Sequence, residues 1–400
     1  MRKFLSVLAI SAMVVSLCAC GSTEEPKEDV QTEQEDTNKE DANKEENKEE
    51  ASTDGVMPAI PKEDIKVGVI HITDPAEGSG YTYTHDQGIV GMQEAIGLSD
   101  DQIIRKNNIN DGDATAIENA IIECLEEGAN VIFATSWGYM DTVEALAAEY
   151  PEVYFSHGTG YKSNGVNFNN YFGRIYQARY LSGIVAGMNT KTNKLGYVAA
   201  MGQDNSEVTG GVNAFAMGAA SVNPDVEVHV KVTNSWFDPE GEAQAAEALI
   251  GMGCDVIAQH CDTPNPQTAA EKAGVYGIGY NSDMSKDAPE AVLTSVMWDW
   301  SKYYTKAVND VINGTWDGTN YFGSMADGLV TLSPLSALCV EGTQEAVDEA
   351  KAKIESGEWD VFDGAIETND GKTVGVDGEK MADGDITGAM NWYYKNVIAE

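Results

Sequence analysis

The stretch DATAIENAIIECLEEGANVIFA, residues 113–134, decides the fold class of this chain. From Ile117 to Leu125 its apolar side chains recur every three or four residues, which is the spacing of one helical face. Asp113 can cap the start of that helix, and Gly128 can end it. The run 130–133, apolar from Val131 onward, then predicts a buried strand, so the stretch is one helix-and-strand unit of an α/β fold.

The same alternation continues on both sides of this unit. Strands are predicted at 65–70, 102–104, 130–133, 153–155, 195–199, 226–232, 255–258, 276–280 and 291–296. Helices are predicted at 87–96, 114–127, 140–150, 175–188, 212–220, 240–252, 267–273, 300–312 and 343–356. Strands that alternate with helices form parallel sheets covered on both faces, so the two runs predict two doubly wound α/β lobes.

The length of the chain, 400 residues, also exceeds that of one typical domain. We predict an N-terminal lobe from residues 63–168 and 297–320, a C-terminal lobe from 169–296 and 321–342, and a C-terminal helix with an extension over 343–400. Open parallel sheets bind ligands beyond the carboxyl ends of their strands. Two facing lobes therefore predict a ligand cleft that closes by a hinge motion.

The N-terminus has the pattern of a secretion signal. Two basic residues precede the apolar run 4–17, which is too short to span a membrane. The sequence LCACG at 17–21 resembles a bacterial lipobox, which implies a signal peptide over 1–19 and a diacylated, palmitate-type modification of Cys20. The rival acceptor, Cys18, would place a bulky leucine where the cleavage site needs a small residue. We expect a lipid-anchored protein on the extracytoplasmic face of the cell membrane, with an ordinary cleaved signal as the alternative.

A strongly acidic segment follows the lipobox. Between Glu24 and Glu50 there are thirteen acidic residues and four lysines, and the only large aliphatic residue is Val30. Such a composition buries too little apolar surface to fold, so residues 20–62 are expected to be a disordered tether. The net charge of the whole chain is −40, which repels nucleic acid and excludes it as a partner.

The sequence carries no enzyme signature. It lacks the HxxxH, HExxH, CxxC and GxSxG spacings of common metal and nucleophile sites. His260 and Cys261 form a poor ligand pair, because neighbouring residues of a strand point to opposite faces. We therefore predict a binding protein without cofactor or metal. The four cysteines beyond the tether are expected to be buried apolar thiols, with their pairing left open.

Aromatic and polar residues gather where the predicted strands end. The candidate ligand-binding residues are Tyr81, Thr82, Ser136, Trp137, Trp236, Asp262, Asn281, Asp283 and Trp298. Flat rings together with hydrogen-bond acceptors suit a flat heteroaromatic ligand that carries N–H donors. The alternative is that each aromatic ring packs against a helix and that Asp283 only caps one. Asp238, followed by Pro239, is better explained as a helix start and is left out of the site.

Five segments also carry a family resemblance. They are GYTYTHDQG at 80–88, IFATSWGYM at 132–140, WFDP at 236–239, GYNSDMSK at 279–286 and LTSV at 293–296. From about Ile65 to Pro334 the chain resembles the basic membrane protein family of lipoproteins, of which the purine nucleoside receptor of spirochaetes is the best-known kind. The resemblance implies the type I periplasmic-binding fold and a substrate-binding protein that delivers a purine to the permease and ATPase subunits of an ABC importer.

The same segments also resemble a branch of the family that binds free purine bases such as adenine. Nucleoside-binding relatives carry an acidic residue near Asn281 and a lysine near Trp298, and both contact ribose. This sequence has an amide and an indole there, so we expect a free base, held between Tyr81 or Trp137 and Trp236. Asp262 or Asp283 is expected to accept an N–H, and Trp298 to close the ribose side. A nucleoside ligand and a sensory receptor that signals to a membrane kinase are the alternatives.

Overall fold

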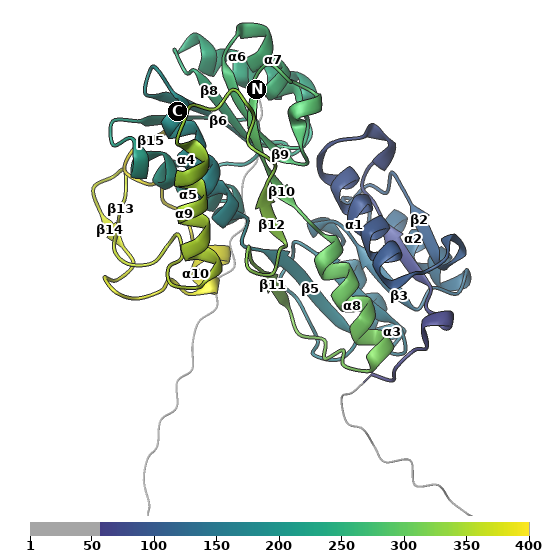
Figure 1. The fold of residues 1–400 in the computed structure, drawn as a ribbon. Helices are drawn as coiled ribbons and strands as arrows, with labels where there is room; N and C mark the ends of the chain where they lie inside the picture. The colour runs from purple at the N-terminus through teal and green to yellow at the C-terminus, as the bar shows by residue number, and fades with distance from the viewer. Residues whose placement is uncertain (1–56, 400) are drawn as a thin grey trace, which may run out of the picture. The chain divides into compact units, whose positions relative to one another are not determined.

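The computed structural model describes residues 57–399. The signal peptide, Cys20 and nearly all of the predicted tether lie outside the described residues. The described chain forms two large β-sheets, each covered by helices, and the elements follow one another from β1 to β15 (Figure 1).

The first sheet belongs to the N-terminal lobe and has the strand order β11-β5-β4-β3-β1-β2. Its strands, all parallel, are β1 (Val67–Ile70), β2 (Ile103–Lys106), β3 (Val131–Ala134), β4 (Tyr154–Gly158), β5 (Phe168–Gly173) and β11 (Tyr321–Gly323). The helices of this lobe are α1 (Gly80–Ile96), α2 (Ala114–Glu126), α3 (Met140–Glu149) and α8 (Ser301–Asn313).

The second sheet belongs to the C-terminal lobe and has the strand order β12-β10-β9-β8-β6-β7-β15. Its strands are β6 (Lys194–Ala199), β7 (Glu227–Val232), β8 (Val256–His260), β9 (Tyr276–Asn281), β10 (Val292–Trp298), β12 (Val330–Leu332) and β15 (Val397–Ala399). All pairings are parallel except that of β12 with β10. The helices are α4 (Ile175–Asn189), α5 (Ser206–Val222), α6 (Pro239–Gly251), α7 (Asn265–Ala273), α9 (Thr343–Glu355) and α10 (Asp383–Gly388). A small hairpin of β13 (Ile366–Glu367) and β14 (Thr373–Val374) completes this part.

The stretch that decided the fold class folds as expected. The Asp113 carboxylate caps α2 by accepting hydrogen bonds from the backbone N–H groups of Thr115 and Ala116, both at 3.1 Å. Gly128 follows the helix with φ +95°, a conformation that glycine adopts without strain. The strand β3 comes next, in the middle of the first sheet. Two parallel sheets built from such units confirm the predicted α/β fold class.

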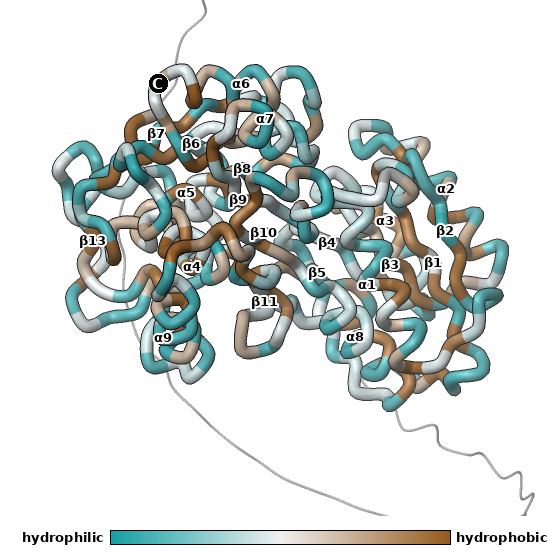
Figure 2. Tube along the Cα trace, turned by 45° about the horizontal axis from the view of Figure 1, so that its top comes forward, coloured by the Kyte–Doolittle hydropathy of each residue, from teal (hydrophilic) through white to brown (hydrophobic). Residues whose placement is uncertain are grey.

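Apolar side chains fill both faces of both sheets. Figure 2 shows hydrophobic residues concentrated along β1, β3 and β10. One core cluster joins α4 and α5 to the second sheet, and further clusters pack α2 and α3 on the first sheet and α6 and α7 on the second. This is the arrangement in which parallel strands are buried on both sides.

Some elements differ from the sequence-based expectation. Helix α1 begins at Gly80 and α5 at Ser206, seven and six residues earlier than predicted. In α5 the Asn205 side chain accepts the N–H of Val208 at 3.0 Å, a cap that the prediction overlooked. Strand β5 was not predicted, because its sequence FNNYFG contains two asparagines.

By sheet membership, the chain crosses between the lobes after Gly173, after Trp298 and after Gly323. The boundary predicted at 168 falls at the first residue of β5, and the one predicted at 320 falls just before β11. The three crossings lie together, since the Arg174 N–H donates to the Gly323 carbonyl oxygen at 2.7 Å and the Trp298 ring lies against Gly173.

The last residues of the predicted tether are packed rather than extended. Met57 is buried in the main core cluster, and Ile60 packs against it. The Ile60 N–H donates to the Val311 carbonyl at 3.2 Å, and the Tyr154 hydroxyl donates to the Pro58 carbonyl. Because these side chains are apolar and find a buried surface, the folded body begins before residue 63.

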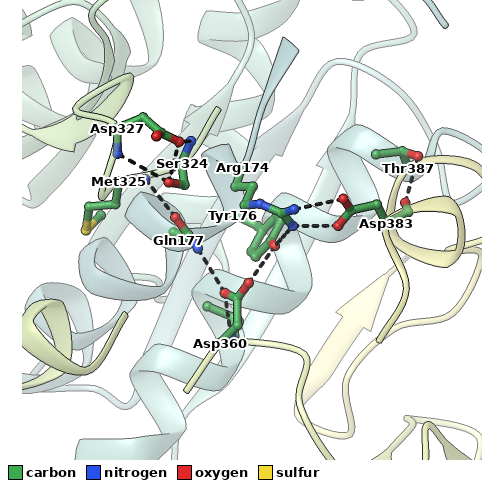
Figure 3. Close-up of polar contacts among 10 residues, drawn as sticks. Arg174, Tyr176, Gln177, Ser324, Met325, Asp327, Asp360, Asp383 and Thr387 are labelled. Carbon is green, nitrogen blue, oxygen red and sulfur yellow. Dashed lines mark hydrogen bonds and ion pairs between the residues drawn. The ribbon is translucent and has the colours of Figure 1, made fainter. Parts of the chain in front are cut away.

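The C-terminal segment, residues 343–399, attaches to the start of α4 (Figure 3). Arg174 donates two hydrogen bonds to the Asp383 carboxylate at 2.6 and 2.8 Å and a third to the Tyr176 hydroxyl at 2.9 Å. The Tyr176 hydroxyl donates in turn to Asp360, also at 2.9 Å. Gln177 bridges the amide N–H of Met325, at 2.9 Å, to Asp360, at 3.1 Å. The segment is thus tied to two of the three crossings.

Within residues 57–399, no helix is long and apolar enough to cross a membrane, and no cluster of three or more metal-ligand side chains occurs. Cys124, Cys254 and Cys261 are buried, and Cys339 is partly buried. Burial raises the pKa of each thiol, for Cys254 to about 11. Burial and a raised pKa both disfavour the reactive thiolate, which fits the expected role of these thiols as packing groups.

Candidate functional site

The two lobes touch where helix α1 begins. Gly80 lies against the backbone of Asp262, which follows β8 of the other lobe. Gly80 has φ +81°, so this close approach uses a conformation that favours glycine. The first turn of α1 therefore faces the carboxyl ends of the second sheet, as expected for a ligand cleft.

The Tyr81 hydroxyl lies near Tyr171 of its own lobe and near two acidic groups of the C-terminal lobe. Burial raises the pKa of its hydroxyl well above the ordinary value, and the nearby Tyr171 hydroxyl and the carboxyls of Asp262 and Glu207 raise it further. Its ring also meets the ring of His85 edge-on, with centroids 4.4 Å apart. The Tyr81 hydroxyl is therefore a neutral group held between the lobes.

Asp262 and Asn281 form a pair of hydrogen-bond acceptors. The Asn281 amide donates to Asp262 Oδ1 at 2.9 Å. Asn281 is fully buried, and its Oδ1 has no hydrogen-bond partner among the described residues. Burial raises the pKa of Asp262 to about 8. A buried acceptor without a donor is costly, so the pair is suited to a ligand that brings N–H groups.

Trp236 lies beside this pair. Its carbonyl oxygen accepts the backbone N–H of Asp262 at 2.9 Å, and its partly buried ring meets His260 edge-on at 5.9 Å. The structure thus brings together four of the predicted site residues, which are Tyr81, Trp236, Asp262 and Asn281. They combine two aromatic rings with two acceptors.

Three ionisable side chains, Glu207, His260 and Arg179, lie close to these site residues. Glu207 stands in the first turn of α5, and its Oε1 lies 3.4 Å from His260 Nε2. His260 is fully buried, and burial lowers its pKa well below the ordinary value, with help from Arg179. The Arg179 guanidinium is also fully buried, 4.0 Å above the ring of Tyr280. Burial raises the pKa of Glu207 to about 7.

Two pockets open at the lobe boundary. The first, of about 440 Å³, is lined by Trp137 and Asn170 of the N-terminal lobe, by Glu207, and by Ile386 of α10. The second, of about 530 Å³, lies between α1 and the ends of β9 and β10 and includes Asn281, Asp283 and Trp298. Neither Tyr81 nor Asp262 lines either pocket, but Asp262 is bonded to Asn281 of the second pocket, and the Glu207 carboxyl of the first acts electrostatically on both residues.

The remaining predicted residues have other surroundings. Trp137 is 60% exposed at the rim of the first pocket. The Ser136 hydroxyl donates to Asp111 at 2.7 Å, and the Thr82 hydroxyl is bonded to Thr73 at 2.9 Å. Asp283 accepts the N–H of Ser285 at 3.0 Å and caps a 3-10 turn, although it also lines the second pocket. Asp238 caps α6, as expected.

Trp298 belongs to a column of rings that runs from one lobe to the other and consists of Phe172, Trp298, Trp300 and His85. Its ring lies 4.5 Å from Trp300 at an interplanar angle of 12° and 5.3 Å from Phe172. Trp300 stacks in the same way on His85, also at 4.5 Å. Trp298 is only 4% exposed, and its indole N–H donates to the Tyr280 hydroxyl at 3.3 Å. It is the last residue of β10, two residues beyond the predicted strand end.

Sequence reasoning missed Glu207, Arg179 and the site role of His260. The helix carrying Glu207 was predicted to start after it, so the residue fell in a presumed loop. Asn205, an ordinary N-cap residue two positions earlier, was the available signal. Arg179 could not be recognised, because a lone arginine within an apolar helix gives no indication of what it faces.

Comparisons with known proteins identify the family to which the chain belongs. The family model "ABC transporter substrate-binding protein PnrA-like" matches residues 65–360. A purine-binding protein of Brucella abortus is 38% identical over 84% of this chain and 93% of its own length. A Haloferax volcanii protein, whose name assigns it to an ABC transporter for glucose, is 35% identical over 78% of each chain.

Solved structures show the same fold. A solute-binding protein of an ABC transporter from Conexibacter woesei superposes with a TM-score of 0.61 at 20% identity, covering 74% of this chain and 98% of its own. A transcriptional activator from Bacillus halodurans superposes at 0.64 with 20% identity, covering 73% and 98%. The predicted periplasmic-binding architecture is confirmed, and the family resemblance with it. The chain belongs to the PnrA-like family of substrate-binding proteins of ABC transporters, which bind their substrates outside the cytoplasm and do not transform them.

Proposed function

We propose that this protein binds a purine in the cleft between its lobes, that a free base such as adenine is preferred to a nucleoside, and that the ligand is passed to the permease of an ABC importer. The observation that carries the proposal is the acceptor pair of Asp262 and Asn281 beside Tyr81 and Trp236. Purine N–H groups can satisfy those oxygens while the rings stack on the flat base. The purine-binding relative from Brucella abortus supports this ligand class.

The preference for a base rests on what stands near the ligand. Asn281 is an uncharged amide with its N–H already bonded to Asp262, and Trp298 is an indole. Neither offers a charged partner to ribose, and desolvated sugar hydroxyls without partners weaken binding. Ser136, Thr82 and Asp283 are secondary candidates in this proposal, because each already has a partner within the protein.

Isothermal titration with adenine, adenosine, guanine, guanosine and glucose tests the proposal. Glucose belongs in the series because of the name carried by the Haloferax volcanii relative. Tight binding of a purine base and weaker binding of its nucleoside are expected. Binding of glucose without any purine would refute the purine assignment, whereas adenosine binding as tightly as adenine would refute only the preference for the base.

The proposal extends to anchoring and to partners. Acylation at Cys20 would hold the protein at the outer surface of the membrane, and the acidic tether would let it reach the permease. A sensory receptor that passes the ligand signal to a membrane kinase is the competing role. Genes for permease and ATPase subunits next to this one support transport, and a neighbouring kinase gene supports sensing.

A further inference from the structure

Glu207 is a cleft carboxyl that lacks a hydrogen-bond donor. Its side chain is 23% exposed, and it lines the first pocket. No side chain or backbone N–H among the described residues donates a hydrogen bond to it. His260 Nε2 lies 3.4 Å away but makes no hydrogen bond of good geometry. A carboxylate in such a position gains from a donor supplied by a ligand.

The groups around Glu207 do not provide that donor. The side chains that interact electrostatically with the Glu207 carboxyl are those of Tyr81, Arg179, Tyr197, His260, Asp262 and Tyr280. Arg179 instead donates to the Gln259 carbonyl at 2.5 Å, and His260 is bonded through Nδ1 to Tyr197 at 3.2 Å. The Glu207 carboxyl is thus a second acceptor in the cleft, separate from the pair formed by Asp262 and Asn281.

Two separate acceptors suit a ligand with donors on two of its edges. A free adenine has an exocyclic amine on one ring and an N–H on the imidazole ring. In a nucleoside the sugar replaces the imidazole N–H, so only the first edge still donates. A cleft with two separate acceptors should therefore bind a free base more tightly than its nucleoside.

We propose that Glu207 is the residue that selects a free purine base, because its carboxylate accepts the hydrogen bond from the imidazole-ring N–H that a nucleoside lacks. This inference rests on the proposed function and adds a residue that determines its specificity. Asp262 and Asn281 take the amine edge, and Glu207 takes the edge to which a sugar would be attached.

Titration calorimetry with adenine, 9-methyladenine and adenosine tests the assignment. The methyl group of 9-methyladenine removes the imidazole N–H but adds little bulk. The wild-type protein is expected to bind adenine at least about tenfold more tightly than 9-methyladenine, the size of one charge-assisted hydrogen bond. Glu207→Gln keeps the shape and loses the charge. It should weaken adenine binding by about tenfold and leave 9-methyladenine binding nearly unchanged.

Glu240→Gln is the matched control. Glu240 occupies the same position in the first turn of α6 that Glu207 occupies in α5, but it is exposed and outside both pockets. The Glu240→Gln variant should bind adenine and 9-methyladenine with the affinities of the wild type. Glu207→Leu, which removes the acceptor altogether, serves if the glutamine variant is unstable, and thermal unfolding checks that each variant folds.

The outcomes separate the two claims. If the wild type binds adenine and 9-methyladenine equally well, or if Glu207→Gln keeps the full preference for adenine, the role of Glu207 is refuted while purine binding stands. If the wild type binds glucose and no purine, the proposed function fails and the role of Glu207 fails with it.

Discussion

A methyl group built on Gly80 would lie 2.4 Å from the carbonyl oxygen of Asp262, which belongs to the opposite lobe. Backbone atoms cannot move aside as the end of a long side chain can, so this contact fixes how closely the first turn of α1 approaches the second sheet. The residues that flank the contact, Tyr81 and the acceptor pair, depend on it for their separation.

Gly80→Ala should therefore hold the cleft open. The new methyl group and the φ of +81° both oppose the native arrangement. We expect purine affinity to fall by at least about tenfold, as measured by calorimetry. Gly274→Ala is the control, since Gly274 has φ +70° but nothing within 4 Å of the added methyl group. Equal loss of affinity in both variants would mean that the interlobe contact is unimportant.

Trp236→Ala tests the aromatic wall. Stacking of a base on an aromatic ring is worth about 1–3 kcal/mol, so adenine affinity should fall by about ten- to a hundredfold. The neighbouring Phe237 is 49% exposed, and Phe237→Ala should bind as the wild type does. A Trp236→Ala protein with unchanged affinity would remove Trp236 from the site.

The pH dependence of binding follows from two carboxyls. The pKa of Asp262 is raised to about 8 and that of Glu207 to about 7. Both must be ionised to accept ligand N–H groups fully, so adenine affinity should rise between about pH 6 and pH 8.5 and binding should release protons. Calorimetry in buffers of different ionisation enthalpy measures that release. Affinity that falls over this range would contradict the assignment.

In the ligand-free protein, Asp262 and Glu207 should lower the free energy of unfolding over the pH range in which they raise ligand affinity. The unfolded chain loses these protons at lower pH than the folded one, so each group costs stability as the pH rises from about 4 to about 8. Asp262→Asn removes one such cost. Its melting temperature relative to that of the wild type should rise with pH over this range, and a constant difference would show that Asp262 titrates normally.

Tyr176→Phe probes the attachment of the C-terminal segment. The Tyr176 hydroxyl joins Arg174 to Asp360 and is buried, so its loss should cost about 1–3 kcal/mol in the free energy of unfolding. Tyr161→Phe should cost nothing, because Tyr161 is 67% exposed. Chemical denaturation measures both, and equal stability of the two variants would show that the network around Arg174 contributes little.

Membrane attachment has its own test. Cys20→Ser should release the mature protein into the soluble fraction, and Cys18→Ser should leave it in the membrane fraction. Fractionation followed by immunoblotting distinguishes them. Retention of the Cys20→Ser protein in the membrane would rule out the lipoprotein assignment.

Elements with strong local signals were predictable, as α2 shows. Its cap, its apolar spacing and its terminal glycine all lie within sixteen residues of sequence, and the helix begins at the predicted residue. The first turn of α1 has no such signal. Its aromatic and threonine residues are weak helix formers, and the turn packs against Asp262, while the start of α8 contacts later turns of α1 at Gly88 and Gly91. Likewise β15 exists only because it pairs with β7, more than 160 residues away.

The residues of the candidate site also fall into those whose position the sequence predicts and those whose position it does not. That Asp262, Asn281 and Trp236 lie together was predictable, because polar and aromatic residues after parallel strands gather at one edge of the sheet. Whether a ring at such an edge faces the cleft or packs inward depends on the residue at which the strand ends. Trp298 ends strand β10, lines the second pocket with part of its surface and stacks on Trp300 and Phe172.

The column of rings that crosses the hinge gives the protein an optical property. The indoles of Trp298 and Trp300 belong to different lobes, since one ends β10 and the other caps α8, yet they stack 4.5 Å apart and nearly parallel. Two chromophores at that separation couple their electronic transitions, and the coupling changes steeply with their separation and mutual angle. Near-ultraviolet circular dichroism and tryptophan emission should therefore report hinge motion directly in the unlabelled protein, with two of its own side chains serving as the spectroscopic probe.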